Sequence, residues 1–93
     1  MIKIVDRTSN TIFYPSTNPD RIAFKANASN DDTIIIPYGV PEAVLGINAE
    51  DNDDVIASAS VSGGTITFGL IDDAGSAEGN DSDLVGEVIL KKQ

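Results

Sequence analysis

Residues 55–71 read VIASASVSGGTITFGLI, and this stretch decides the fold class. Along most of this stretch, on both sides of Gly63-Gly64, apolar residues alternate with serine or threonine. Two consecutive glycines can both adopt positive φ, which a two-residue hairpin turn requires. Such a turn pairs positions whose numbers add up to 127, so Val61 faces Ile66. The same rule pairs Ala57 with Leu70, Ala59 with Phe68, Ser58 with Gly69, Ser60 with Thr67, and Ser62 with Thr65.

Both strands of this hairpin agree on which face is apolar, and a slip of one residue would destroy that match. The opposite face carries only small hydroxyl side chains, namely Ser58, Ser60, Ser62, Thr65 and Thr67. A solvated sheet face more often carries Lys and Glu, which also prevent unwanted strand pairing. The hydroxyl face is therefore a candidate contact face, and simple exposure to solvent is the alternative.

The rest of the chain shows further short alternating segments and no helical period of apolar residues. The strands expected from this pattern are residues 21–26, 33–36, 43–49 and 84–90, with weaker candidates at 2–5 and 11–14. We expect one all-β domain over residues 1–93, an antiparallel β-sandwich or barrel-like fold of about 7–8 strands. Residues 1–14 are either edge strands or an N-terminal arm.

For two of these strands the sequence also predicts which faces are apolar or buried. Residues 33–36 form a continuous apolar run, which predicts a strand buried on both faces. In residues 43–49 the alternation predicts one apolar face, formed by Ala43, Leu45, Ile47 and Ala49.

Residues 26–90 contain thirteen carboxylates and no Lys, Arg or His, within a chain of net charge −9. Such a surface repels nucleic-acid phosphates and anionic lipids, so we expect neither nucleic acid nor membrane as a partner. No apolar run is long enough to span a membrane, and the charged N-terminal residues do not resemble a secretory signal. We therefore expect synthesis in a cytoplasm. Salt adaptation is another interpretation of the acidic composition.

The acidic loops are expected to share one end of the molecule, because successive loops of an antiparallel stack lie at alternate ends. Residues 31–32, 50–54 and 72–83 then form an acidic end. The uncharged turns at residues 38–41 and 63–64 lie at the opposite end, together with both termini. Tyr38 and Val40 at that opposite end are further candidate interface residues.

Catalysis is not expected, because the chain has no His and no Cys. Acid–base and nucleophilic chemistry at neutral pH usually depends on such groups, and so do zinc and haem sites. No catalytic or cofactor-binding residue is assigned. Calcium is the remaining cofactor candidate, because alternating carboxylates suit a hard cation, although a solvated acidic turn is the simpler interpretation. Its possible ligands are Asp51, Asp53, Asp72, Asp73, Asp81 and Asp83. Phe13, Tyr14 and Tyr38 suggest a sugar-stacking platform, against the simpler interpretation that Phe13 belongs to the core.

Two segments carry a resemblance to a known class of protein. They are PYGVPEAVL at residues 37–45 and SVSGGTITF at residues 60–68. In style they resemble the small β-rich decoration, or cement, proteins on the heads of tailed bacteriophages. The resemblance covers about half of the chain and rests on no diagnostic motif. It implies a place on the capsid surface of a virion and binding to the major capsid protein or another virion protein.

Association with other chains also follows from the size of the domain, because so small a core commonly needs support and no disulfide can supply it. A homo-oligomer is therefore expected. The alternative function is a cation- or carbohydrate-binding β-sandwich module of a fibre or surface assembly.

Overall fold

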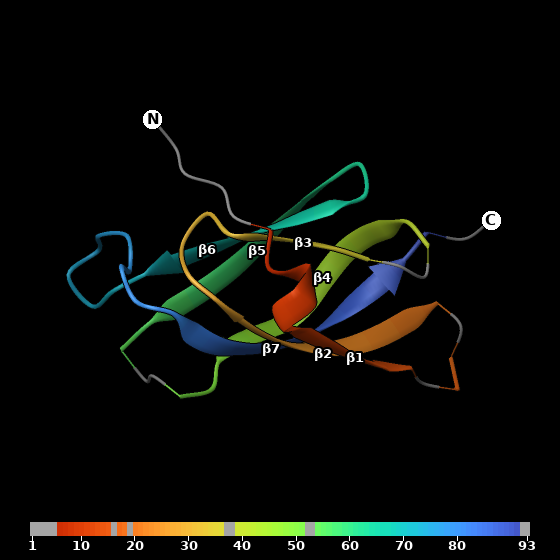
Figure 1. The fold of residues 1–93 in the computed structure, drawn as a ribbon, viewed down its shortest axis with the longest axis horizontal. Helices are drawn as coiled ribbons and strands as arrows, with labels where there is room; N and C mark the ends of the chain where they lie inside the picture. The colour runs from red at the N-terminus through yellow and green to blue at the C-terminus, as the bar shows by residue number, and fades with distance from the viewer. Residues whose placement is uncertain (1–5, 16, 19, 37–38, 52–53, 92–93) are drawn as a thin grey trace.

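The computed structural model describes residues 6–15, 17–18, 20–36, 39–51 and 54–91. In this part of the chain seven strands form two antiparallel sheets, which pack as a sandwich that does not close into a barrel (Figure 1). A short 3-10 turn at Thr8–Asn10 precedes the first strand. The strands are β1 (Thr11–Pro15), β2 (Arg21–Ala28), β3 (Thr33–Ile35), β4 (Pro41–Ala49), β5 (Ile56–Ser62), β6 (Thr65–Ile71) and β7 (Ser82–Leu90).

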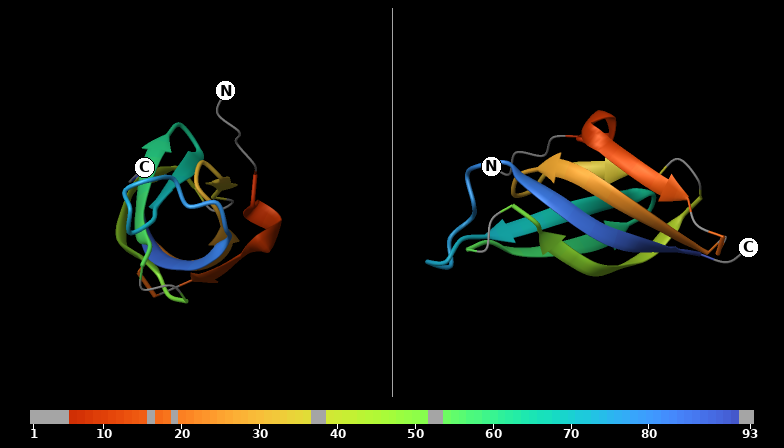
Figure 2. Two further views of the ribbon diagram at one scale, coloured as in Figure 1. Left: turned by 90° about the vertical axis from the view of Figure 1, so that its left-hand side faces the viewer. Right: turned by 90° about the horizontal axis from the view of Figure 1, so that it is seen from below.

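One sheet has the strand order β1–β2–β7–β4, and the other has the order β3–β6–β5. The chain crosses between the sheets four times, from β2 to β3, from β3 to β4, from β4 to β5 and from β6 to β7. Figure 2 shows the two sheets curving around a common interior. The molecule is elongated, with extents of 41 × 27 × 20 Å, so its ends are well separated. The described residues include no helix long and apolar enough to cross a lipid bilayer.

The hairpin of β5 and β6 has the register expected from the two-glycine turn. Val61 pairs with Ile66, Ala59 with Phe68, and Ser60 with Thr67. Gly63 adopts a φ of +60°, a conformation that glycine reaches without strain. Local turn chemistry and side-chain alternation were therefore sufficient to predict this element.

The core lies between the sheets and is built from alternate residues of each strand. The rings of Phe24 and Phe68 meet across the two sheets with their centroids 5.9 Å apart. Ile34 extends the core from β3, and it is fully buried. The other core side chains are Ile22, Ala26, Ala28, Ile36, Ala49, Val55, Ile66, Leu70, Leu84, Val88 and Leu90.

The expectation that residues 33–36 are buried on both faces is wrong at one position. Ile35 is 48% exposed, while its neighbours Ile34 and Ile36 are buried. β3 pairs with β6 and lies at an edge of the smaller sheet. On its outer face Thr33 is buried where the N-terminal segment joins β3, and Ile35 is left exposed. A continuous apolar run can therefore belong to a strand that buries only one of its two faces completely.

The single apolar face expected for residues 43–49 is also wrong, because β4 is interrupted by a bulge. Its pairing with β7 shifts register between Leu45 and Asn48, where Gly46 has a φ of +61°. The extra residue reverses which side chains face inward. Val44 and Ile47 pack against the core, and Leu45 is 43% exposed.

The two candidate strands near the N-terminus, residues 2–5 and 11–14, have different outcomes. Residues 11–14 belong to β1, which pairs with β2 as an edge strand of the larger sheet. The candidate strand at residues 2–5 lies outside the described residues. The long loop expected over residues 72–83 is shorter, because β7 begins at Ser82.

Candidate functional site: the acidic end and two uncharged surfaces

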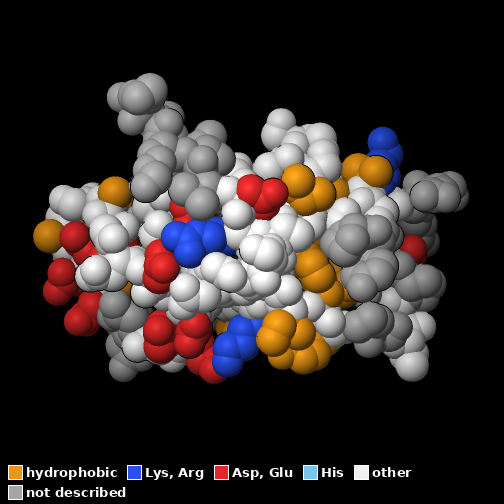
Figure 3. All heavy atoms as spheres, viewed as in Figure 1, with side chains coloured by type: hydrophobic (Ala, Val, Ile, Leu, Met, Phe, Trp, Pro, Cys, Tyr) orange, Lys and Arg blue, Asp and Glu red, His pale blue; other side chains and the backbone are white. Residues whose placement is uncertain are grey.

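The three acidic loops meet at one end of the molecule, as the topology predicted. The Asp51 side chain accepts a hydrogen bond of 3.0 Å from the backbone N–H of Asp83, and Glu50 N–H donates to the Asp83 carbonyl over 2.7 Å. Figure 3 shows carboxylates gathered at the left-hand end of the molecule. In the described chain we define this acidic end as residues 29–32, 50–51, 54 and 72–81.

Arg7 joins two of these loops, and sequence reasoning did not foresee this role. Its Nε lies 2.8 Å from Asp32 Oδ2, in a close ionic contact that lacks the alignment of a hydrogen bond. Its terminal nitrogens donate to the two carboxylate oxygens of Asp81 over 3.3 and 3.4 Å. One guanidinium group from the N-terminal segment therefore bridges loops that lie far apart in sequence. The fork geometry of Arg suits such two-sided contacts with carboxylates.

Asp32 is a buried structural residue, with 2% of its surface exposed. Its Oδ2 accepts hydrogen bonds from the backbone N–H and hydroxyl of Ser29 at 2.8 and 3.1 Å. The turn that it closes includes Asp31 at a φ of +69°, a conformation that Asp tolerates better than most residues. Asn30 then accepts the Leu70 N–H at 2.9 Å, which ties the turn to β6.

The N-terminal segment is anchored to β3 next to this turn. Arg7 N–H donates to the Thr33 carbonyl, and the Thr8 hydroxyl accepts the Ile35 N–H at 2.8 Å. That hydroxyl also donates to Asp6 Oδ1 over 2.6 Å. This hydrogen bond, followed by one from the Thr8 backbone N–H, lowers the pKa of Asp6 below its ordinary value.

The calcium candidates do not assemble into one site among the described residues. No group of three or more carboxylates there could hold a metal ion. Asp81 contacts Arg7, and Asp83 accepts a 2.9 Å hydrogen bond from Asn27. Asp72 accepts the N–H groups of two residues of its own loop, and Asp73 is exposed. Asp51 binds the Asp83 N–H, while Asp53 lies outside the described residues.

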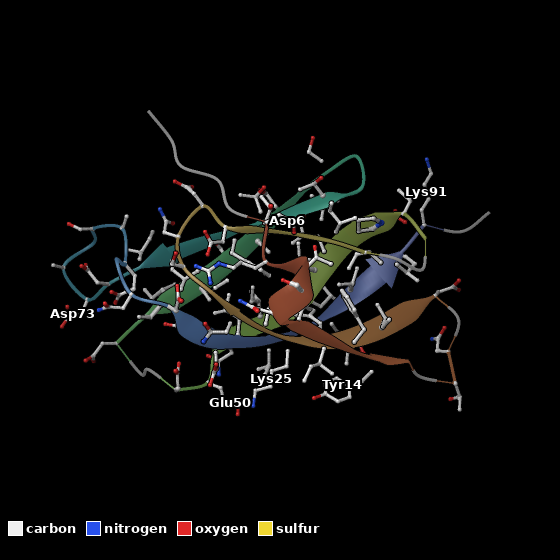
Figure 4. All side chains as sticks on the ribbon, in the orientation of Figure 1. Asp6, Tyr14, Lys25, Glu50, Asp73 and Lys91 are labelled. Atoms are coloured by element: carbon white, nitrogen blue, oxygen red, sulfur yellow. The ribbon has the colours of Figure 1, made fainter. Side chains whose placement is uncertain are left out.

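The outer faces of the two sheets differ in charge. On the larger sheet Arg21 pairs with Glu87 at 2.8 Å, and Lys25 lies 3.6 Å from Glu50 (Figure 4). The outer face of the smaller sheet carries no charged residue. We call it the uncharged face, and define it as Ile35, Ile56, Ser58, Ser60, Ser62, Thr65, Thr67 and Ile71. All of the predicted hydroxyl residues therefore share one face, where the three serines are exposed and the two threonines partly so.

The end opposite the acidic loops is a second surface with little net charge. Leu90 N–H donates to the Asp20 carbonyl, and Lys91 N–H donates to the Val40 carbonyl. These bonds hold the described residues 17–18, 20, 39–41 and 90–91 together, and we call this group the neutral end. Figure 4 shows Lys91 and Asp73 at opposite ends of the long axis. Val40 is 49% exposed there, and Tyr38 lies outside the described residues.

The aromatic platform is not supported by the geometry. Phe13 packs against the core, and Tyr14 is 49% exposed. Neighbouring residues of a strand point to opposite faces, so these two rings cannot form one stacking surface.

Comparison with known protein families, with characterised proteins and with solved structures found no match to this chain. The geometry itself presents an acidic end closed by Arg7, a neutral end and an uncharged sheet face. The Arg7 bridge had one weak signal in the sequence, which is that 6 basic residues must serve 15 carboxylates. That imbalance does not say which basic residue goes where.

Proposed function

We propose that this chain is a non-enzymatic structural protein of a virus particle, which decorates or cements a capsid shell through protein–protein contacts. Its partner is the major capsid protein or another virion protein. The chain is made in the host cytoplasm and resides on the capsid surface. The resemblance of residues 37–45 and 60–68 to phage head decoration proteins supports this choice over other structural roles.

The separation of charge along the long axis of 41 Å is the observation that carries the proposal. Carboxylates of three loops crowd the acidic end, whereas the charged residues of the neutral end, as defined above, are Asp20 and Lys91, which balance each other. A protein that stands on a crowded particle benefits when its outer end is strongly charged, because like charges oppose aggregation. The neutral end is then the end that docks.

Among the described residues of the neutral end, Val40 is the large apolar side chain that is exposed. Its side chain is half exposed, and its carbonyl is tied to Lys91 N–H over 2.8 Å. A held, exposed apolar side chain within a charge-balanced surface suits the centre of a docking patch, where charged residues are normally depleted.

Co-sedimentation tests this role. The probe is a shell assembled from the major capsid protein encoded nearest to this chain in its own genome. We expect saturable binding of the wild-type chain. Val40→Asp weakens binding at least tenfold, because an unpaired carboxylate at the contact costs more than about 1.4 kcal/mol to desolvate.

The matched control is Ala74→Asp, which adds the same charge at an exposed position of the acidic end. It should leave shell binding unchanged. Absence of binding by the wild-type chain at any concentration contradicts the proposal. Loss of binding in the control alone means that the chain docks by the acidic end.

A further inference from the structure

The uncharged face has a pattern along its length that the shell contact does not use. Ile56 and Ile71 form an exposed cross-strand pair at one end of the face, where they are 69% and 43% exposed. Ile35 is exposed in the row at the other end, beside Thr65. Small hydroxyl side chains fill the middle. The face is therefore apolar at both ends and carries small hydroxyl side chains in between.

Charge is distributed unequally around the same face. The Ile56 and Ile71 pair adjoins the acidic end, because Asp54 precedes β5 and Asp72 follows β6. The Ile35 end adjoins the uncharged turn at Gly63-Gly64, and a single carboxylate, Asp6, is linked to it through the Thr8 hydroxyl that accepts the Ile35 N–H, among the described residues. Any partner that covers the whole face must therefore avoid placing carboxylates over the end that holds Ile56 and Ile71.

We propose that the uncharged face binds the same face of a second copy of this chain, related by a two-fold axis that lies in the plane of the contact and runs across the strands. This symmetry places Ile56 and Ile71 of one copy over Ile35 of the other. It also sets the two acidic ends at opposite ends of the dimer, where they repel each other least. Stacking in the same direction would instead superpose the acidic ends.

The middle of the face suits this packing. Ser and Thr side chains are short, so the two sheets approach closely and their hydroxyls can exchange hydrogen bonds. Sheets pack with their strands within about 30° of each other, an arrangement that keeps the apolar ends matched. A two-fold contact is also the commonest form of self-association, because one patch serves both partners.

The area of the face sets the expected strength of the dimer. β5 and β6 have seven residues each and β3 has three. At about 3.3 Å per residue and about 4.8 Å between strands, the face covers roughly 270 Å². One partner in a stable complex usually buries about 800 Å². We therefore expect a weak dimer that forms at high protein concentration. On a shell, where the proposed function would hold copies close together, a contact of this strength becomes effective.

Sedimentation velocity of the full chain between about 10 µM and 1 mM tests the pairing. The wild type should shift from monomer towards dimer across this range. Raising NaCl from 50 to 500 mM should strengthen the dimer, because salt screens the repulsion between two chains of net charge −9. A monomer at every concentration and salt level overturns the proposal.

Ser60→Lys identifies the surface, because it places a charge in the middle of the face in both copies. It should weaken the dimer at least tenfold. Asn48→Lys is the control, since it adds the same charge at an exposed position of β4 on the larger sheet. It should dimerise as the wild type does. Dimerisation of Ser60→Lys with wild-type strength overturns the proposal.

Two further measurements separate this proposal from misfolding and from the proposed function. Ile56→Ser should also weaken the dimer without adding charge, and its thermal unfolding should stay close to that of the wild type because Ile56 is largely exposed. Ser60→Lys should still bind shells through the neutral end. If wild type fails to dimerise but binds shells, the pairing is wrong and the proposed function stands. If the wild type dimerises but does not bind shells, the pairing stands and the proposed function is wrong.

Discussion

Among the described basic residues, Arg7 enters the acidic end most deeply, with 22% of its side chain exposed, compared with 42% for Lys25. It contacts Asp32, whose side chain is 3% exposed. Burial of a carboxylate without a positive partner is costly, and the Ser29 hydrogen bonds compensate only part of that cost. Replacement of Arg7 should therefore lower the free energy of unfolding of the whole domain.

Arg7→Met tests this assignment while preserving most of the side-chain volume. We expect the free energy of unfolding to fall by about 3 kcal/mol, the lower end of the range for breaking a buried ion pair. Urea denaturation at neutral pH measures it. The control is Arg21→Met, whose ion pair with Glu87 is exposed on both sides. Loss of such a pair should cost no more than about 1 kcal/mol. Equal costs in the two variants would contradict the structural role of Arg7.

At the scale of the strands, β2 and β7 pack closely because β7 has a glycine at the point of contact. A Cβ added at Gly86 would lie 3.0 Å from the ring of Phe24 and 3.4 Å from the backbone of Ile47. Phe24 is itself held against Phe68 in the core. The ring therefore has little room to yield.

Gly86→Ala should for this reason destabilise the protein by about 1–3 kcal/mol, the usual cost of overpacking a core. Gly79→Ala is the matched control, since nothing lies within 4 Å of its added Cβ. Thermal unfolding of the two variants measures the difference. A Gly86→Ala variant as stable as Gly79→Ala would mean that the Phe24 ring moves aside without cost.

Strands also differed in how well they could be predicted. The β5–β6 hairpin was read from alternation and a two-glycine turn, because both act within a few residues. β4 has the same kind of alternation, yet the bulge at Gly46 turns Leu45 outward. A glycine in an apolar segment signals such a possibility, but the register of β7 decides whether the bulge forms.

At the scale of the molecule, the dominant feature is net charge −9 with most described carboxylates gathered at one end. Their mutual repulsion opposes the compact state, and the ion pairs of Arg7 and Lys25 offset part of it. Screening should therefore favour folding.

We accordingly expect the melting temperature to rise as NaCl increases from 20 to 300 mM, measured by circular dichroism at pH 7. A few millimolar CaCl₂ should raise it no more than MgCl₂ at equal ionic strength. A large stabilisation by calcium alone would instead favour the cation-binding alternative. A fall in melting temperature with NaCl would show that the ion pairs outweigh the repulsion.

By itself, the sequence determined the all-β class, the register of the central hairpin, the single uncharged face and the common end of the acidic loops. These properties follow from alternation, turn residues and the order of strands, all of which are local or topological. The packing of the folded chain was needed to learn that Arg7 reaches Asp32 and Asp81, that Ile35 and Leu45 face outward, and that Thr8 ties the N-terminal segment to β3. Contacts of this kind join residues up to 74 positions apart, so they depend on how the two sheets pack and not on any local pattern.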